Sequence, residues 1–551
     1  MSQDYFKKLN NKINKYKAKY GNDQKKVAIR MAWWSLIYFI KGQEVKTIDH
    51  SQESQKFLRI GIAEGGGFGD NLFQLTYIKE IRKMFDMPVI IDFYCLSYTA
   101  FQNFPFIDNC YEYPSSHHKM DLYDVYIISR RFYTIHKFNE EKTKFFSKEF
   151  YDFCKDCKNL TDRVFLLGGT DNLFEQYALL FNKNRLEHPN VHGLLPITRY
   201  TPKYCQWDEK NFNILNQLKI ENVRYITICR AVNSKHKNSN PKLWPLHYYN
   251  QLIYKIKKHY PYIKIVQVGL SDKFGLMEGV DICLVGKTSL DQIKVILKYS
   301  LLHIDGEGGL VHLKNFLNGR SLVLFGPTNP EVFGYEENIN LRSSVCKRCC
   351  EWVTRDWFNA CLRDLDAQYP LCMKALTPDI VFDSFNEYMK SLPHYDYHVF
   401  PIKKDQIEKK MACTGKKIAQ ICRANNIVEN VNLDKNDLYV FDMSLSVKND
   451  LYEKNCAYIK EAKMAGFNVE FATPYNIPVK NETFDMVFCD NLQNVLFQEY
   501  CVYEMLRILK DTGLLLLSIK STKEREMISA LFGKTLNPDV VFVAIEKNSG
   551  R

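Results

Sequence analysis

A glycine-rich turn that ends in an acidic residue is the first segment that could do chemistry. The sequence reads Glu-Gly-Gly-Gly-Phe-Gly-Asp-Asn at 64–71. Glycines such as Gly66, Gly67 and Gly69 permit positive φ and the close approach of a ligand, and a helix that starts there presents unpaired N–H groups. Asp70 would then face a ligand at the helix start. In the alternative interpretation Asp70 only caps the helix and the glycines only turn the chain.

A lysine inside the segment Pro-Lys-Leu-Trp-Pro at 241–245 is a second candidate. Lys242 precedes an expected helix at 246–259, where its charge could neutralise a leaving diphosphate. Taken alone, it is better explained as a solvated loop lysine.

A third segment reads Asp-Gly-Glu-Gly-Gly-Leu-Val-His at 305–312. Gly308 and Gly309 would offer backbone N–H groups to phosphate oxygens at the start of a helix. Glu307 could accept hydrogen bonds from sugar hydroxyls, and His312 could add a donor. The alternative for His312 is a packed helix residue without a ligand.

A further turn follows the next expected strand and reads Phe-Gly-Pro-Thr-Asn-Pro at 325–330. Carboxyl ends of neighbouring parallel strands meet at one edge of a sheet. We therefore expect Gly326 and Thr328 to border the same pocket as the segment 305–312.

Five cysteines fall between positions 346 and 372. A Cys-x-x-Cys pair with two further thiols suits tetrahedral zinc or iron. Free thiols in a reducing compartment are the alternative, and Cys350 is the member left out of the predicted site. The four candidate ligands are Cys346, Cys349, Cys361 and Cys372.

The elements that must position these residues alternate between strand and helix. Short apolar runs separated by helical periodicity predict parallel sheets covered by helices. Expected strands in the first part are 57–64, 89–94, 125–129 and 164–167. The pattern restarts near residue 222, with strands at 225–229, 263–268, 301–304 and 322–325. Expected helices there are 246–259, 289–300 with a Ser-x-x-Gln capping box, 310–317 closed by Gly319, and one opened by Thr-Pro at 377–378.

A third α/β unit follows from about residue 399, with strands expected at 439–442, 469–472, 486–489 and 514–519 and a helix at 498–509. The fold class predicted is therefore α/β: two Rossmann-like lobes facing a cleft, of GT-B type, and a third Rossmann-like domain. The predicted boundaries are 1–56, 57–215, 216–398 and 399–551.

In this order, the motifs resemble the heptosyltransferase family of GT-B glycosyltransferases, glycosyltransferase family nine. The resemblance rests on Gly-Asp at 69–70, Lys-x-Trp-Pro at 242–245, Gly-Lys-Thr-Ser-Leu at 286–290, the glycine turn at 305–312 and Phe-Gly-Pro-Thr-x-Pro at 325–330. It covers about residues 57–390.

This resemblance implies an inverting, metal-independent transfer of a sugar from a nucleotide-diphosphate donor of the ADP-heptose kind to a surface glycan or a protein hydroxyl. It implies that Asp70 is the general base, that Lys242 stabilises the leaving diphosphate, and that Thr288 and residues 307–312 line the donor. The chain departs from the family where Glu-Gly-Gly at 307–309 replaces Asp-Ser-Gly. The cysteine cluster resembles the structural iron finger of the autotransporter heptosyltransferases.

The last part resembles the later half of class I S-adenosylmethionine-dependent methyltransferases. It shares Phe-Asp-x-Val at 484–487 and Glu-x-x-Arg-x-Leu-Lys-x-x-Gly at 504–513, and Asp442 matches the acidic strand end that binds the cofactor ribose. The expected Gly-x-Gly-x-Gly loop is missing; its nearest remnant is Ala-Cys-Thr-Gly at 412–415. An active methyltransferase and a degenerate binding or assembly domain both remain open, as does a non-catalytic nucleotide-sugar-binding scaffold for the whole chain.

The chain has 551 residues and a net charge of +12, which suits acidic partners such as nucleotide diphosphates. No recognisable nucleic-acid-binding motif accompanies this charge, so we expect no nucleic-acid partner. No secretory signal is evident, and a cytoplasmic location is expected. The basic, aromatic residues 1–40 fit either peripheral contact with the inner membrane or packing on a domain or neighbouring subunit, and we expect a homo-oligomer.

Overall fold

The computed structural model describes residues 56–113, 119–129, 132–164, 178–190, 193–221, 223–230, 242–271, 275–346, 349–350, 360–392, 395–411, 414–421, 436–442, 467–489 and 492–549. Contacts divide the chain into two units. One contains Met1–Gln102, Ile107–Thr170 and Pro189–Pro196, and the other contains Asn103–Phe106, Asp171–His188 and Ile197–Arg551. Apart from Lys56, the extension at 1–56 lies outside the described residues, so both interpretations of it stay predictions.

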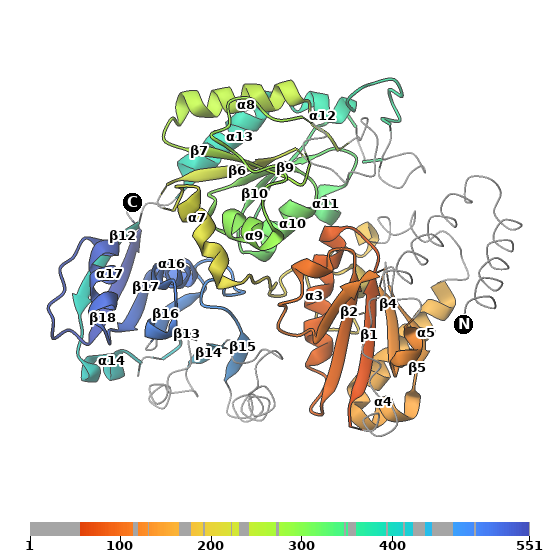
Figure 1. The fold of residues 1–551 in the computed structure, drawn as a ribbon, viewed down its shortest axis with the longest axis horizontal. Helices are drawn as coiled ribbons and strands as arrows, with labels where there is room; N and C mark the ends of the chain where they lie inside the picture. Colours follow the sequence, from red (N-terminus) through yellow and green to blue (C-terminus); the bar gives the residue numbers. More distant parts are fainter. Residues whose placement is uncertain are drawn as a thin grey trace, which may run out of the picture. The chain divides into compact units, whose positions relative to one another are not determined.

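The first unit is built on a five-stranded sheet in the order β3-β2-β1-β4-β5, in which only the β4–β5 pair is antiparallel (Figure 1). Its strands are β1 (Leu58–Glu64), β2 (Val89–Cys95), β3 (Asn109–Glu112), β4 (Val125–Ser129) and β5 (Tyr133–Phe138). Its helices are α3 (Phe68–Arg82), α4 (Glu140–Phe146) and α5 (Lys148–Val164). The strands expected at 57–64, 89–94 and 125–129 are confirmed.

The strand expected at 164–167 is wrong at its first residue, because Val164 ends helix α5, and 165–167 lie outside the described residues. Helix α5 has a strong apolar stripe, and this amphipathic pattern carries the chain in helical form to Val164.

The second unit begins with a fully parallel sheet in the order β11-β10-β9-β6-β7-β8. Helices α8 and α13 cover one face, and α9 and α10 cover the other (Figure 1). The strands are β6 (Tyr225–Cys229), β7 (Lys264–Val268), β8 (Ile282–Cys283), β9 (His303–Gly306), β10 (Ser321–Phe325) and β11 (Ile339–Arg342). The helices are α7 (Asn213–Gln217), α8 (Leu246–His259), α9 (Leu290–Tyr299), α10 (Gly309–Phe316), α11 (Pro330–Phe333), α12 (Leu371–Ala375) and α13 (Pro378–Ser391).

The local signals in this lobe are confirmed at two helix starts and refined at one helix end. Ser289 and Gln292 form the expected capping box of α9, and Thr377 caps α13 in front of a proline. Gly319 closes helix α10 as expected, since its N–H donates to the Lys314 carbonyl at 2.9 Å, but the residue in the left-handed conformation is Asn318, with φ 57°. Asparagine tolerates that conformation better than most residues.

The second unit also contains a seven-stranded sheet in the order β12-β18-β17-β16-β13-β14-β15, in which β18 is antiparallel to both neighbours. Strands β15, β14, β13, β16 and β17 follow the 3-2-1-4-5 order of doubly wound folds. The strands are β12 (Tyr395–Pro401), β13 (Lys417–Ile421), β14 (Asp437–Asp442), β15 (Asn468–Phe471), β16 (Phe484–Cys489), β17 (Leu509–Ser518) and β18 (Phe542–Ser549). The helices are α14 (Lys404–Met411), α16 (Gln498–Ile508) and α17 (Thr522–Phe532).

The α/β class with three Rossmann-like sheets is therefore confirmed. The lobe boundaries stay predictions, since contacts join the second lobe and the third domain into one unit. Among the described helices, none combines the length and apolarity needed to cross a bilayer.

Candidate functional site

The glycine-rich turn of the first unit joins β1 to α3. Helix α3 starts at Phe68, and the Asp70 carboxylate accepts a hydrogen bond from the Gly67 N–H at 3.0 Å. Asp70 is half-buried. Asp70 is therefore not the N-cap, which is Gly67; it is the third residue of the helix, and its carboxylate binds the N-cap N–H at the helix N-terminus, where a negative charge is favoured.

The glycines of this turn are needed because they leave room for neighbouring side chains, and not because the backbone has a positive φ there. None of Gly65, Gly66, Gly67 and Gly69 has a positive φ, which corrects the expectation from the sequence. A Cβ on Gly66 would lie 2.7 Å from the Asp70 carboxylate, and one on Gly65 would lie 2.7 Å from the Tyr113 ring. Larger residues here would displace Asp70.

A buried carboxylate that was not among the predicted site residues binds the backbone of this turn. Glu64 is 2% exposed, and its carboxylate accepts hydrogen bonds from the Gly66 N–H at 2.8 Å and from Gln74 at 3.4 Å. Gln74 in turn accepts one from the Tyr133 hydroxyl at 2.8 Å. An acidic residue directly before a glycine run was the available signal in the sequence. We infer that Glu64 fixes the backbone that presents Asp70.

In the second unit, three of the predicted residues come together. The Lys242 ammonium pairs with the Glu307 carboxylate, whose other oxygen lies 3.2 Å from His312 Nε2. The second ring nitrogen of His312 lies 2.8 Å from the Tyr335 hydroxyl. Tyr335 was not predicted, because nothing in its sequence neighbourhood distinguishes it from a core tyrosine.

The electrostatics of this cluster keep Glu307 ionised. Burial by itself would raise the pKa of the Glu307 carboxyl, but Lys242 and His312 outweigh burial and hold it well below its usual range. An ionised carboxylate only accepts hydrogen bonds. Glu307 can therefore accept hydroxyl groups of a ligand while Lys242 supplies positive charge beside it.

Two buried contacts fix the loop that carries Lys242. Trp244 is 1% exposed, and its indole N–H donates to the Leu376 carbonyl at 2.7 Å. The Arg230 Nε donates to the Trp244 carbonyl at 3.0 Å. The tryptophan of the Lys-x-Trp-Pro motif thus holds the start of α8 against the lobe, so that Lys242 is positioned by core packing.

The turn at 306–309 brings backbone close to the same place. Gly308 is in extended backbone with φ −178°, and α10 starts at Gly309. A Cβ on Gly306 would lie 3.1 Å from the Lys242 carbonyl. The N–H groups at the start of α10 therefore lie on the loop of Glu307, in the arrangement that binds anions.

The remaining predicted donor residues lie on two other loops, one after β10, which is next to β9, and one after β8, which β6 and β7 separate from β9. Thr328 follows β10, is fully buried, and has a hydroxyl without a hydrogen-bond partner among the described residues. Gly326 precedes it at the end of the same strand. Thr288 lies in the turn before α9, where Gly286 has a φ of 69° that requires glycine.

The cysteine cluster is only partly assembled. Cys346, Cys350 and Cys361 lie near Cys372, whose pKa burial raises to about 12, with smaller contributions from those three thiols. Cys349 instead donates to the Thr328 carbonyl at 3.0 Å. Within the described part of the chain, no three Cys, His, Asp or Glu side chains form a metal-sized group. Binding of iron or zinc by this cluster stays a prediction.

The predicted cofactor residues of the third domain are divided between described and undescribed segments. Asp442 ends β14, and the residues after it, 443–466, lie outside the described residues. Gly415 has a φ of 72° but precedes β13, whereas a cofactor loop should follow this strand. Residues 412–413 and 422–435 also lie outside the described part. Binding of S-adenosylmethionine therefore stays a prediction.

No protein-family model matches the sequence, and no curated protein matches it. Solved structures do resemble it. The ADP-heptose lipopolysaccharide heptosyltransferase II of Escherichia coli is 13% identical, with 60% of this chain and 99% of that chain covered and a TM-score of 0.41. The dodecameric iron-containing heptosyltransferase TibC, solved with ADP-D-β-D-heptose, is 12% identical, with 61% and 77% covered and a TM-score of 0.40.

The last part of the chain resembles other proteins. An S-adenosylmethionine-dependent methyltransferase from Aquifex aeolicus is 16% identical, with 26% of this chain and 88% of that chain covered and a TM-score of 0.21. These three solved structures are two heptosyltransferases and one methyltransferase.

Proposed function

We propose that this chain is a glycosyltransferase that transfers a sugar from a nucleoside-diphosphate donor to a hydroxyl group, with inversion at the sugar carbon. The observation that carries the proposal is the cluster of Lys242, Glu307 and His312 beside the start of α10. It combines a positive charge and helix N–H groups, which bind a diphosphate, with a carboxylate that accepts hydrogen bonds from sugar hydroxyls.

Lys242 and the α10 N-terminus stabilise the charge that develops on the diphosphate as it leaves. In the ligand-free protein Glu307 holds the ammonium group of Lys242 in place. Glu307 also accepts hydroxyls of the ribose or the sugar. Thr288 and Thr328 contribute further hydrogen bonds to the donor.

Asp70 is the proposed general base. It takes the proton of the acceptor hydroxyl while the acceptor oxygen bonds to the anomeric carbon and the bond from that carbon to the diphosphate oxygen breaks. Donor and acceptor are thereby converted to a glycoside and a nucleoside diphosphate, and the proton ends on Asp70. General bases of this kind contribute roughly 10²–10⁴-fold in rate.

The proposal extends to the setting of the reaction. An ADP-linked heptose or hexose is the proposed donor, and a bacterial surface glycan or a protein hydroxyl is the proposed acceptor. We place the reaction in the cytoplasm, with membrane contact through residues 1–40, in a homo-oligomer that has a structural iron or zinc at the cysteine cluster.

Calorimetric titration with ADP, and with UDP and GDP for comparison, tests the donor site. We expect one of these nucleotides to bind, and Lys242→Met to weaken binding by about tenfold to a hundredfold through loss of the phosphate contact. Lys255→Met is the matched control, since Lys255 pairs with Asp379 and lies over the Phe382 ring in the same lobe, and neither contact involves a candidate donor residue. Equal affinities in the wild type and Lys242→Met would remove Lys242 from the site.

A further inference from the structure

Helices α9 and α10 of the second lobe hold each other by their C-terminal ends. Lys298 of α9 donates to the Leu317 carbonyl after α10 at 3.1 Å. Lys314 of α10 donates to the Ser300 carbonyl after α9 at 2.7 Å and also to the Leu297 carbonyl. Both lysine side chains are buried, and cations at helix C-termini are favoured by the unpaired carbonyls there.

The opposite ends of these two helices carry candidate donor residues. Thr288 directly precedes the N-cap of α9, and Gly308 is the N-cap of α10. A helix moves as a rigid rod over such a short length. A shift of the C-terminal ends, where Lys298 and Lys314 bind, therefore displaces Thr288 and Gly308 at the N-terminal ends.

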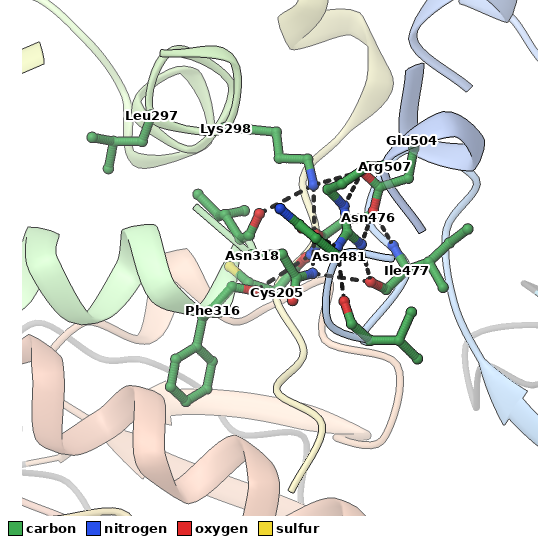
Figure 2. A network of polar contacts seen from close by, with 12 residues as sticks. Cys205, Leu297, Lys298, Phe316, Asn318, Asn476, Ile477, Asn481, Glu504 and Arg507 are labelled. Atoms are coloured by element: carbon green, nitrogen blue, oxygen red, sulfur yellow. Dashed lines mark hydrogen bonds and ion pairs between the residues drawn. The ribbon is translucent and has the colours of Figure 1, made fainter. Parts of the chain in front are cut away.

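The third domain provides the negative charge that pairs with Lys298. Glu504 of α16 accepts a hydrogen bond from Lys298 at 2.9 Å, and the two side chains are 3% and 6% exposed (Figure 2). Arg507 binds the same carboxylate through two nitrogens, at 2.7 Å and 2.9 Å. Glu504 and Arg507 belong to the Glu-x-x-Arg motif, so this motif is engaged in holding the lobe.

Asn476 of the loop between β15 and β16 extends the same contact. Its side-chain N–H donates to the Cys205 carbonyl at 2.8 Å, and its side-chain oxygen accepts from Lys298 and Asn318 at 3.0 Å each (Figure 2). Glu504 in turn accepts the N–H of Ile477 at 2.7 Å. The loop is thus fixed by partners from both domains.

Aromatic side chains surround this polar network. Phe212 lies 4.8 Å from Tyr475, 4.5 Å from Phe497 and 4.8 Å from Tyr500, measured between ring centroids. Tyr299, the last residue of α9, lies 4.5 Å from Tyr500. Such packing excludes water from the ion pair and strengthens it.

We propose that Glu504 is a positioning residue for donor binding, acting through Lys298 on the helices that carry Thr288 and Gly308. The third domain is then a fixed part of the donor lobe that sets the affinity for the nucleotide. This inference rests on the proposed function, because it concerns the donor site named there.

Calorimetry with ADP on full-length Glu504→Gln tests the inference. We expect ADP affinity to fall by about tenfold, a coupling of ordinary size for linked sites. Glu524→Gln is the matched control: Glu524 is an equally buried carboxylate of the third domain, and it accepts hydrogen bonds from Lys520 and Ser521. Its ADP affinity should stay unchanged.

A double-mutant cycle separates positioning from loss of stability. Lys298→Met and Glu504→Gln should each weaken ADP binding, and the double variant should be no weaker than the worse single variant. A lower melting temperature with unchanged ADP affinity would overturn the inference. Glu504→Asp, which keeps the charge, should restore part of the affinity if Glu504→Gln does not fold.

Hydrogen exchange without any ligand distinguishes this inference from the proposed function. Glu504→Gln should speed exchange of the amides at the starts of α9 and α10, and Glu524→Gln should not. Unchanged exchange there contradicts the positioning role. The wild type could fail to bind ADP, UDP and GDP while exchange is still faster in Glu504→Gln. That result would contradict the nucleotide site and would support the effect of Glu504 on α9 and α10.

Discussion

Glu307 is the residue around which the second-lobe site is organised. It holds Lys242 and contacts His312, whose other nitrogen reaches Tyr335. Lys242, Glu307 and His312 could be named from the sequence, because a glycine turn follows an expected strand and the motifs resemble those of a known family in their order. Tyr335 could not, because its role comes from a contact 23 positions away.

The carboxylate of Glu504 makes stability depend on pH. Burial by itself raises its pKa, but Arg507 and Lys298 lower it to about 2 from an ordinary value of 4.5. A lowered pKa of a carboxyl contributes stability that is present above pH 4.5 and is lost as the pH falls toward 2. The wild type should therefore lose about 3 kcal/mol more unfolding free energy than Glu504→Gln over this range.

Urea denaturation at a series of pH values measures this difference. The slope of unfolding free energy against pH should be steeper for the wild type than for Glu504→Gln below pH 4.5. Parallel slopes for the two proteins would mean that Glu504 is not held ionised in the folded state.

At the scale of elements, local sequence signals predicted where helices and strands begin. They predicted less well what individual residues in the turns do. Short apolar runs predicted most strands of the three sheets, and the expected capping box of α9 is observed. The glycines at 65–69 were expected to need positive φ, but they make room for Asp70 and Tyr113. Sequence cannot show which side chain will occupy the space that a glycine leaves.

The capping box predicts the stability of α9. Ser289→Ala removes the oxygen that accepts the Gln292 N–H at 3.2 Å, and Ser289 is exposed, so no cavity forms. We expect a loss of about 1 kcal/mol in unfolding free energy, measured by urea denaturation. Ser384→Ala, inside the exposed face of α13, is the control and should change stability by less than about 0.5 kcal/mol. A loss equal to that of the control would exclude the cap as a stabilising contact.

At the scale of the whole molecule, the sequence predicted three α/β parts but not that the last two form one unit. The residues that join them, such as Phe212, Lys298, Asn476 and Glu504, are separated by up to 292 positions and form no motif together. They meet because α9 and the residue before α7 contact α16 and the loop between β15 and β16. Pattern within one stretch of sequence cannot reveal it.

Phe212 links the stability of the second lobe to that of the third domain. Phe212→Ala should destabilise the unit by about 3–5 kcal/mol, because the side chain is 2% exposed and packs on rings of both domains. Hydrogen exchange should then quicken in β6 and in β16 together. Phe93→Ala, a buried phenylalanine of the first unit, should leave both strands unchanged. Faster exchange in β6 alone would contradict one cooperative unit.

Release of a nucleoside diphosphate from a panel of nucleotide sugars, followed by mass spectrometry in the wild type and in Asp70→Asn, tests the central claim most directly. The asparagine keeps an oxygen that can cap α3 beside Gly67, so it preserves the fold while removing the base. We predict sugar-dependent release by the wild type and a loss of about 10²–10⁴-fold in Asp70→Asn. Equal release by both proteins, or none from any nucleotide sugar by the wild type in the presence of acceptor, would contradict the account.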